Sequence, residues 1–407
     1  MHRPGHSLRP SVLAALLAVP LFACSGSASP GNGVEPGDEA GIDGGHGATT
    51  HDAGGGGSSG GDAATHPQPG ADAGSTTPPD GGGGGSHDSG DAGGGSPDGG
   101  GAEAGAPSSE FAPYFPTWVW GASGYAFTSL VDLQKKAHVN DVTIAFVLSN
   151  GGCDTTQDIE QNAADVKAFV TAGGHVKASF GGADGTYVEA KCASAAALAT
   201  AIGDFVDATG ITDLDFDIEQ DPVLTDAVNA MRGQALASVQ ASKGIQVAFT
   251  LAANPHTSGS PGGLTSQGLS VVTNAISAGV HVAHVNLMTM DYGDSYGGKA
   301  LAPVAIGSLT DANAQLVKAV ASLDAQHAWQ MLGVIPMIGK NDDAEVFSIA
   351  DAKSLEAFAA QNHLGLVSFW SIDRDQVCPS GADYNSCSTV DTTNFEFATI
   401  FEAVTAP

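Results

Sequence analysis

The sequence predicts an α/β fold, a (β/α)8 TIM barrel, and three observations support this prediction. Residues 110–407 are long enough for one large domain with its own core. Eight short apolar runs recur through that region, and segments with apolar residues three or four positions apart lie between them. Strands that alternate with helices imply a parallel sheet with right-handed crossovers, and eight such units match the usual size of this barrel. An open doubly wound sheet is the alternative, but no GxGxxG turn follows the first run.

The apolar runs are rich in β-branched residues, which favour strands. The expected strands are 111–120, 142–148, 175–180, 211–219, 245–252, 282–290, 329–337 and 365–370. The segments between them are rich in Ala, which favours helices, and they place their apolar residues along one helical face. The expected helices are 163–173, 193–209, 235–244, 311–326 and 351–361.

The start of the chain has the features of an export signal. Arg3 and Arg9 precede the apolar run SVLAALLAVPLFA, which is too short to cross a bilayer and is interrupted by Pro20. We therefore expect a signal peptide over residues 1–23. The sequence LFAC that ends at Cys24 resembles the bacterial lipoprotein cleavage box, which implies a lipidated Cys24 and a protein held at the cell surface or on a periplasm-facing membrane. An ordinary signal peptidase site, and a freely extracellular protein, is the alternative.

Residues 24–109 form a long linker rich in Gly, Ser and Asp. After Cys24 this linker contains no Lys, Arg, Phe, Tyr or Trp. Such a composition cannot bury enough apolar surface to fold, so we expect a disordered, lipid-anchored tether that holds the folded region 110–407 away from a membrane surface.

The charge of the chain restricts the classes of partner. The formal net charge is −30 at pH 7. Phosphate backbones repel so acidic a protein, which excludes nucleic acid, and anionic lipid headgroups are disfavoured for the same reason. Contact with a membrane is therefore expected only through the lipid anchor, and a neutral or cationic substrate fits best. We expect a monomer without a metal or another cofactor.

The most informative segment is DLDFDIE at residues 213–219, where acidic and apolar residues alternate. Alternate side chains of a strand share one face. The acidic face, which must point into the barrel, comprises Asp213, Asp215, Asp217 and Glu219. Burial and mutual repulsion raise the pKa of grouped carboxylates, so one can stay protonated as a general acid while another is ionised. Glu219 is nearest the carboxyl end of the strand, where barrel active sites lie. A calcium loop would place glycine and turn residues, not Leu, Phe and Ile, between its acids.

These residues carry a resemblance to a known family. DLDFDIE resembles the DxxDxDxE signature of glycoside hydrolase family 18, the chitinase family. Residues 179–182 (SFGG) are similar to its SxGG motif, residues 288–292 (MTMDY) to its MxYD motif, and residues 369–370 (FW) to the place of its sugar-binding tryptophan. The resemblance covers 111–407. The chain departs from the family where Thr212 precedes the first acid and where Met290 replaces the family's tyrosine.

The resemblance implies hydrolysis of β-1,4-linked N-acetylglucosamine polymers such as chitin, with retention and by substrate-assisted catalysis. Glu219 would protonate the glycosidic oxygen. Asp217 would accept a hydrogen bond from the substrate's acetamido N–H, and Asp215, partnered by Ser179, would share a proton with Asp217.

The remaining site assignments also follow from the resemblance. Asp291 would line the sugar subsite and Trp370 would form its floor. Met288 and Met290 would contribute to substrate binding. Tyr292 lies on the same side as Met290 if the strand continues, so it is expected to reach the site in place of the family's tyrosine.

Several other aromatic and histidine side chains can be placed only by position. Trp118 and Trp120 end the first run and either extend the sugar platform or pack in the core. Trp329 begins the seventh run and is assigned to packing. Asn254 and His256 follow the fifth strand, where both a site role and loop hydrogen bonding are open. His281 and His284 lie at the start of the sixth strand, where a structural role is expected.

The cysteines in the folded region are expected to form two disulfides. Cys153 and Cys192 follow neighbouring strands, and Cys378 and Cys387 flank one loop after the eighth strand. Export permits oxidation, so we expect the pairs Cys153–Cys192 and Cys378–Cys387. Free buried thiols are the alternative.

Two other functions fit the same signature. An endo-β-N-acetylglucosaminidase that cuts glycoprotein glycans shares the carboxylate motif. A non-catalytic chitin- or glycan-binding lectin shares the barrel but typically lacks the acid, which this chain retains as Glu219.

Overall fold

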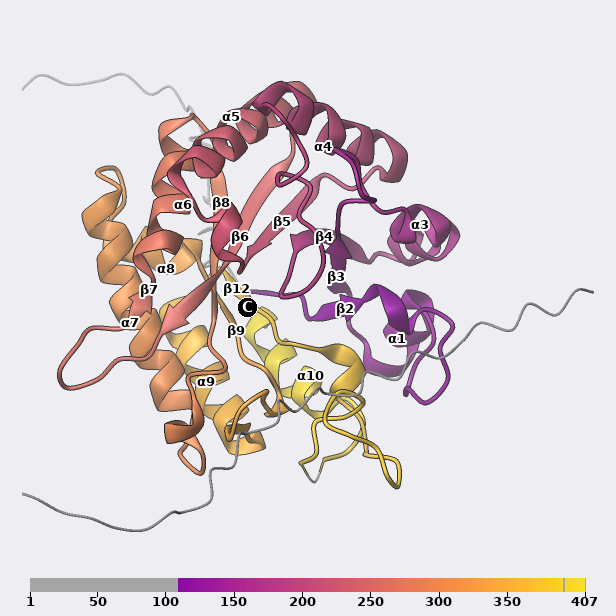
Figure 1. Cartoon of the computed structure of the whole chain (residues 1–407). Coiled ribbons are helices and arrows are strands. Elements are labelled where there is room, and N and C mark those ends of the chain that lie inside the picture. The colour runs from indigo at the N-terminus through magenta and orange to yellow at the C-terminus, as the bar shows by residue number, and fades with distance from the viewer. Residues whose placement is uncertain (1–108, 391, 407) are drawn as a thin grey trace, which may run out of the picture. The chain divides into compact units, whose positions relative to one another are not determined.

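A computed structural model of the chain describes residues 109–390 and 392–406. A ring of parallel strands lies at its centre and helices cover the outside (Figure 1). The strands of the ring are β1 (Glu110–Phe111), β2 (Tyr114–Pro116), β3 (Asp141–Val147), β4 (His175–Gly181), β5 (Asp213–Ile218), β6 (Gln246–Asn254), β8 (Val282–Met288), β9 (Leu332–Ile335) and β12 (Leu366–Val367).

Helices follow most of these strands. They are α1 (Leu130–Ala137), α2 (Asp158–Gln161), α3 (Ala163–Thr171), α4 (Ala195–Thr209), α5 (Asp226–Lys243), α6 (Ser266–Ser277), α7 (Ala302–Ala319), α8 (Ala325–Met331), α9 (Ile349–Asn362) and α10 (Glu396–Phe401). Two short additions lie among the connections. The strand β7 (Gly263–Leu264) pairs with the end of β6, and β10 (Gly339–Lys340) pairs with β11 (Val346–Phe347) as a hairpin.

The ring closes through its first segment. The strand order is β1-β12-β9-β8-β6-β5-β4-β3-β2, and β1 and β2 are two parts of one extended stretch of chain. The amide of Ala112 donates to the carbonyl of Val367 over 3.1 Å, and the amide of Tyr114 donates to that of Phe369 over 3.1 Å. On its other side β2 pairs in parallel with β3. The parallel (β/α)8 barrel predicted from the sequence is confirmed.

The structure corrects some of the expected element bounds. The first run stops being a strand at Pro116, and Thr117–Val119 form a 3-10 turn. The seventh run begins as helix, because Trp329 belongs to α8 and the strand starts only at Leu332. Apolar runs do not distinguish a buried helix end from a strand, which is why periodicity alone placed both bounds wrongly.

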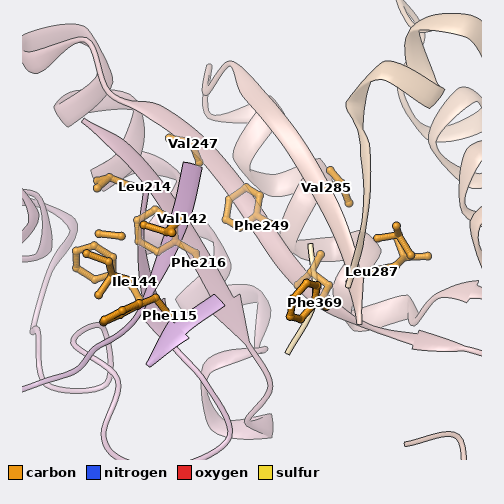
Figure 2. Close-up of a cluster of buried hydrophobic side chains, with 14 of the residues drawn as sticks. Phe115, Val142, Ile144, Leu214, Phe216, Val247, Phe249, Val285, Leu287 and Phe369 are labelled. Atoms are coloured by element: carbon orange, nitrogen blue, oxygen red, sulfur yellow. The ribbon is translucent and has the colours of Figure 1, made fainter. Parts of the chain in front are cut away.

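The core lies between the ring and its helices. Figure 2 shows side chains of this layer, including Leu214, Phe216 and Phe249, gathered around the barrel strands. Phe216 stacks on Phe180 with ring centroids 5.1 Å apart, and Phe180 meets Phe205 of α4 edge-on at 5.1 Å. The apolar residues of DLDFDIE therefore face the helices and leave the acids on the inside of the barrel.

The expected signal peptide, Cys24 and nearly all of the expected linker lie outside the described residues. Within 109–390 and 392–406, no helix combines the length and the apolar character that a membrane span requires.

Replacing Phe216 by Ala is expected to destabilise the barrel by about 3–5 kcal/mol, because it leaves a cavity between β5 and α4. Phe216 is 2% exposed, whereas Val170 on α3 is 50% exposed and provides a surface control as Val170→Ala. Chemical denaturation of both variants measures the free energies of unfolding, and equal losses in the two would contradict this account of the core.

Candidate active site

The carboxylates of β5 form a column inside the barrel, and its base is neutralised by a lysine. Asp213 is 6% exposed. Its carboxylate accepts a hydrogen bond of 2.6 Å from Lys177 Nζ, which also lies 2.9 Å from Glu110 Oε1. The group formed by Glu110, His175 and Asp213 has the donor types of a metal site. Lys177 already supplies a positive charge there, so this end of the barrel is held by an ion-pair network.

The second carboxylate of the column, Asp215, is surrounded by neutral donors. It accepts hydrogen bonds of 3.0 Å from Tyr114, 2.7 Å from Ser179, 2.9 Å from Thr250 and 3.3 Å from Asn286. Burial raises the pKa of Asp215, and the hydroxyl donors oppose that rise. These donors supply the hydrogen bonds that an ionised Asp215 needs inside the barrel.

The third carboxylate, Asp217, lacks such partners. It is 4% exposed, and its Oδ1 has no hydrogen-bond partner among the described residues. Burial, followed by the charges of Glu219 and Asp215, holds the pKa of Asp217 well above its ordinary value. A carboxyl in this position favours the protonated form or a substrate group that donates a hydrogen bond to it.

Glu219 follows β5 directly and lines a cavity of about 510 Å³ at the carboxyl end of the strands. Burial raises the pKa of Glu219 to about 7, with further contributions from the charges of Asp291, Asp184 and Asp342. At neutral pH a substantial fraction of Glu219 is therefore protonated and can donate its proton.

Aromatic rings form one wall of this cavity. Trp370 stacks on Phe146 with centroids 5.5 Å apart and an interplanar angle of 13°. Trp118 meets Trp370 edge-on at 6.0 Å and is 55% exposed. Trp118 therefore extends the wall, whereas Trp120 does not line the cavity: it packs on Phe115 and donates to Asp165 over 2.9 Å.

The two methionines and Asp291 line the cavity, but Tyr292 does not. Asp291 has a positive φ of 51°, so the chain turns there and the strand alternation ends. The Tyr292 hydroxyl lies instead 3.1 Å from Ser308 Oγ of α7. The expectation that Tyr292 reaches the site is wrong, because it assumed that the strand continues. Met288 and Met290 take positions in the wall as expected.

Asp291 is held by the segment that carries the β10–β11 hairpin. Its Oδ1 accepts a hydrogen bond of 3.0 Å from the amide of Asp342, and its own amide donates to Asn341 Oδ1 over 3.4 Å. Desolvation raises the pKa of Asp291 to about 6, opposed by the Asp342 amide and assisted by the charges of Asp342 and Asp343.

The two glycines of SFGG allow close contact at the ends of β4 and β5. A Cβ on Gly181 would lie 2.1 Å from the carbonyl oxygen of Asp217, and one on Gly182 would lie 2.6 Å from the ring of Phe146. Both glycines also have positive φ, of 112° and 94°. A side chain at either position would push β4 away from β5 or from the aromatic wall.

The remaining aromatic and histidine candidates lie away from the cavity. Trp329 packs edge-on against Phe358 of α9, in agreement with its assignment to packing. His284 lies at the base of the barrel, with Nε2 3.8 Å from Glu110 Oε2. The backbone of His281 forms hydrogen bonds with the Gln240 side chain.

The pair after β6 forms loop contacts. His256 Nδ1 lies 2.6 Å from Asp311 Oδ2 of α7, and the carbonyl of Asn254 accepts a hydrogen bond of 2.8 Å from Ser308. Neither residue lines the cavity, so the structure favours loop hydrogen bonding over a site role.

Both expected disulfides are present. Cys153 pairs with Cys192, and Cys378 pairs with Cys387. The second bond closes a loop that carries Asp383, Asn385 and Ser386 into the cavity wall. Both bonds therefore constrain loops on the face of the barrel where Glu219 lies.

The sequence did not identify several residues that complete the site. Tyr114 lines the cavity and donates to Asp215, and its inward place on the first strand could have indicated this. Asp342 reaches the cavity from the loop between β10 and β11, and Arg374 from the short 3-10 helix Ile372–Arg374, and both segments are too short to show a periodicity. Arg374 is the single cation among the described residues that line the cavity, and it donates to the carbonyls of Lys340, Trp370 and Tyr384.

Replacing Asp342 by Asn is expected to lower the pKa of Glu219 from about 7, because it removes one of the negative charges that raise this pKa. Carbon-13 NMR titration of the glutamate carboxyls measures the change, and Glu219→Gln identifies the resonance. Asp207→Asn, which alters a carboxylate paired with Lys243, is the control and should leave this pKa unchanged. An unchanged or higher pKa in the Asp342 variant would refute the electrostatic account.

Comparison with known proteins agrees with the site. No family model matches the chain. It is 35% identical over 266 residues to Endochitinase 11 of Metarhizium anisopliae, covering 60% of this chain and 49% of that protein. It is 33% identical over 306 residues to a probable bifunctional chitinase/lysozyme of Escherichia coli, covering 68% of this chain and 33% of that protein. The chain thus spans less than half the length of these two curated relatives.

A solved structure matches the whole barrel. Active domain 2 of the chitinase from Pyrococcus furiosus, in catalytic-site mutants, superposes with a TM-score of 0.64 at 29% sequence identity. The match covers 73% of this chain and 95% of that one. The chain is therefore similar to chitinases across its barrel, which agrees with the resemblance of its carboxylate motif to glycoside hydrolase family 18.

Proposed function

We propose that the protein hydrolyses β-1,4-linked N-acetylglucosamine polymers such as chitin, with retention of anomeric configuration. The observation that carries the proposal is Glu219, placed at the cavity with a pKa of about 7, directly above the unpartnered carboxyl of Asp217. The names of its relatives support it, as does a structure of the Pyrococcus furiosus domain complexed with chito-oligosaccharides.

Glu219 acts as the general acid. It transfers its proton to the glycosidic oxygen as the bond from that oxygen to the anomeric carbon breaks. The acetamido oxygen of the same sugar attacks the anomeric carbon and gives an oxazolinium intermediate, so no enzyme carboxylate forms a bond to the sugar. Glu219, now ionised, then takes a proton from the water that opens this intermediate.

Asp217 orients the reacting acetamido group. Its buried Oδ1 is free to accept a hydrogen bond from the acetamido N–H, which becomes more acidic as positive charge develops on the ring. Asp215 lies deeper, and its donors Tyr114, Ser179 and Thr250 stabilise its negative charge. The charge of Asp215 in turn raises the pKa of Asp217, so the titrations of the two carboxyls depend on each other.

The aromatic wall holds the sugar. The apolar side of a pyranose ring stacks on the indole of Trp370. Phe146 in turn stacks on this indole and holds it in place. Met288, Met290 and Asp291 complete the subsite. The thioether of Met290 is a poor hydrogen-bond partner, so substrate positioning depends more on Asp217 and on the aromatic wall.

Replacing Glu219 by Gln should abolish turnover of chitin oligosaccharides while preserving their binding. Glu356→Gln, on the outer helix α9, is the matched control.

In the unaltered protein, activity should fall as the pH rises through about 7, because the general acid must carry its proton. Analysis of the released sugars measures turnover in each variant and at each pH, and calorimetry with chitin oligosaccharides measures binding. Binding without turnover by the unaltered protein would instead indicate a lectin.

We also propose that the protein is exported and anchored through lipid on Cys24. The support is the sequence alone: a basic start, an apolar run and LFAC before a glycine-rich linker. The membrane that carries the lipid anchor determines whether the protein lies at the cell surface or faces the periplasm.

Radiolabelled fatty acid should enter the unaltered protein and not Cys24→Ala. The variant should also appear in the soluble exported fraction, because it lacks the anchor. Label in neither protein would contradict lipidation and would indicate a freely secreted protein.

A further inference from the structure

A buried tyrosine lies behind the catalytic strand. Tyr187 is in the loop between β4 and α4 and is 2% exposed. Its hydroxyl accepts a hydrogen bond of 2.9 Å from the backbone amide of Glu219. The same hydroxyl lies 2.8 Å from the carbonyl of Gly182 and 3.0 Å from that of Asp217, and its proton is donated toward these oxygens.

Glu219 depends on this contact because it lies just beyond the strand ladder. Pairing of β5 with β4 ends at Asp217, and pairing of β5 with β6 ends at Ile218. The Glu219 amide is therefore held by a side chain and not by a neighbouring strand. One phenol joins the last residues of β5 to the end of β4.

The position of Tyr187 is itself constrained. Its ring packs so closely on Gly181 that a Cβ there would come within 2.7 Å of it. Two residues further along the same loop, Glu189 accepts a hydrogen bond of 2.8 Å from Arg232 of α5, and these side chains are 5% and 1% exposed. Cys192, in the same loop, is bonded to Cys153. The loop is therefore anchored at Glu189 and at Cys192, within five residues of Tyr187.

We propose that Tyr187 is a positioning residue that fixes the backbone of Glu219, and with it the direction in which the carboxyl points into the cavity. The proposal rests on the proposed role of Glu219 as the general acid. Tyr187 does not line the cavity, so its effect on turnover is exerted through Glu219 and not through contact with the substrate.

The charged groups around Glu219 set the expected pH behaviour. They are Asp217 on β5, Asp184 after β4, Asp291 after β8 and Asp342 beside the hairpin. A Glu219 released from Tyr187 turns toward water, which favours its ionised form and lowers its pKa. The alkaline limb of the activity profile should then move to lower pH, because a general acid loses activity as it ionises.

The test compares Tyr187→Phe with Tyr292→Phe. Each variant removes one mostly buried hydroxyl, and Tyr292, hydrogen-bonded to Ser308, lies outside the cavity. For Tyr187→Phe we expect about a tenfold lower kcat, a KM within about twofold of the unaltered protein and the shifted alkaline limb. Hydrogen exchange at the Glu219 amide should be faster by about tenfold, because the amide has lost its acceptor. Tyr292→Phe should change none of these, although both variants lower Tm.

Two results would overturn the proposal. An unchanged Glu219 amide exchange in Tyr187→Phe would show that the hydroxyl does not hold this backbone. Equal losses of kcat in the two variants would show a general effect of destabilisation. If the unaltered protein cleaves no chitin oligosaccharide, the proposed function fails, and the exchange measurement still decides whether Tyr187 fixes Glu219.

Discussion

The enclosure of several carboxylates in one narrow barrel is the constraint on which the rest of the structure depends. Desolvation opposes the ionised form of each acid, and the acids of β5 also repel one another. The desolvation and mutual repulsion of these acids are offset to a different degree at each depth of the barrel. At the base, Lys177 neutralises Asp213. In the middle, hydroxyl and amide donors surround Asp215. At the top, the charge is left without compensation, and the pKa values of Asp217 and Glu219 rise.

This gradient is what makes the top of the column chemically useful. Asp213 at the base is engaged in an ion pair with Lys177. A carboxyl that is left partly desolvated keeps its proton near neutral pH and can transfer it. The surrounding loops add to the effect, because Asp184, Asp291 and Asp342 all bring negative charge toward Glu219. The uncompensated charge at this end of the barrel favours the protonated forms of Asp217 and Glu219.

The fold was predictable because its signals are local. The alternation in residues 213–219 fixed which side chains face inward, since a strand has no other way to orient them. The order of apolar runs and helices predicted a parallel barrel, with an open doubly wound sheet as the alternative. The predicted bounds of elements were wrong where two elements meet without a break. Trp329, predicted to begin the seventh strand, lies in helix α8, and the strand begins directly after that helix at Leu332. Asp342, in a loop, and Arg374, in a one-turn 3-10 helix, could not be placed, because their approach to the cavity depends on contacts with distant segments.

The sequence by itself determined the carboxylate column, the barrel that encloses it and the likeness of its motifs to one family, since each follows from spacing along a single strand or from strand order. Only the tertiary structure decided which neighbours each carboxylate has. It turned Tyr292 away from the cavity through the positive φ of Asp291, brought Tyr114 and Ser179 to Asp215, and placed Tyr187 behind Glu219. These contacts join residues far apart in the chain, and hydrogen bonds depend on distance and angle, which no sequence pattern specifies.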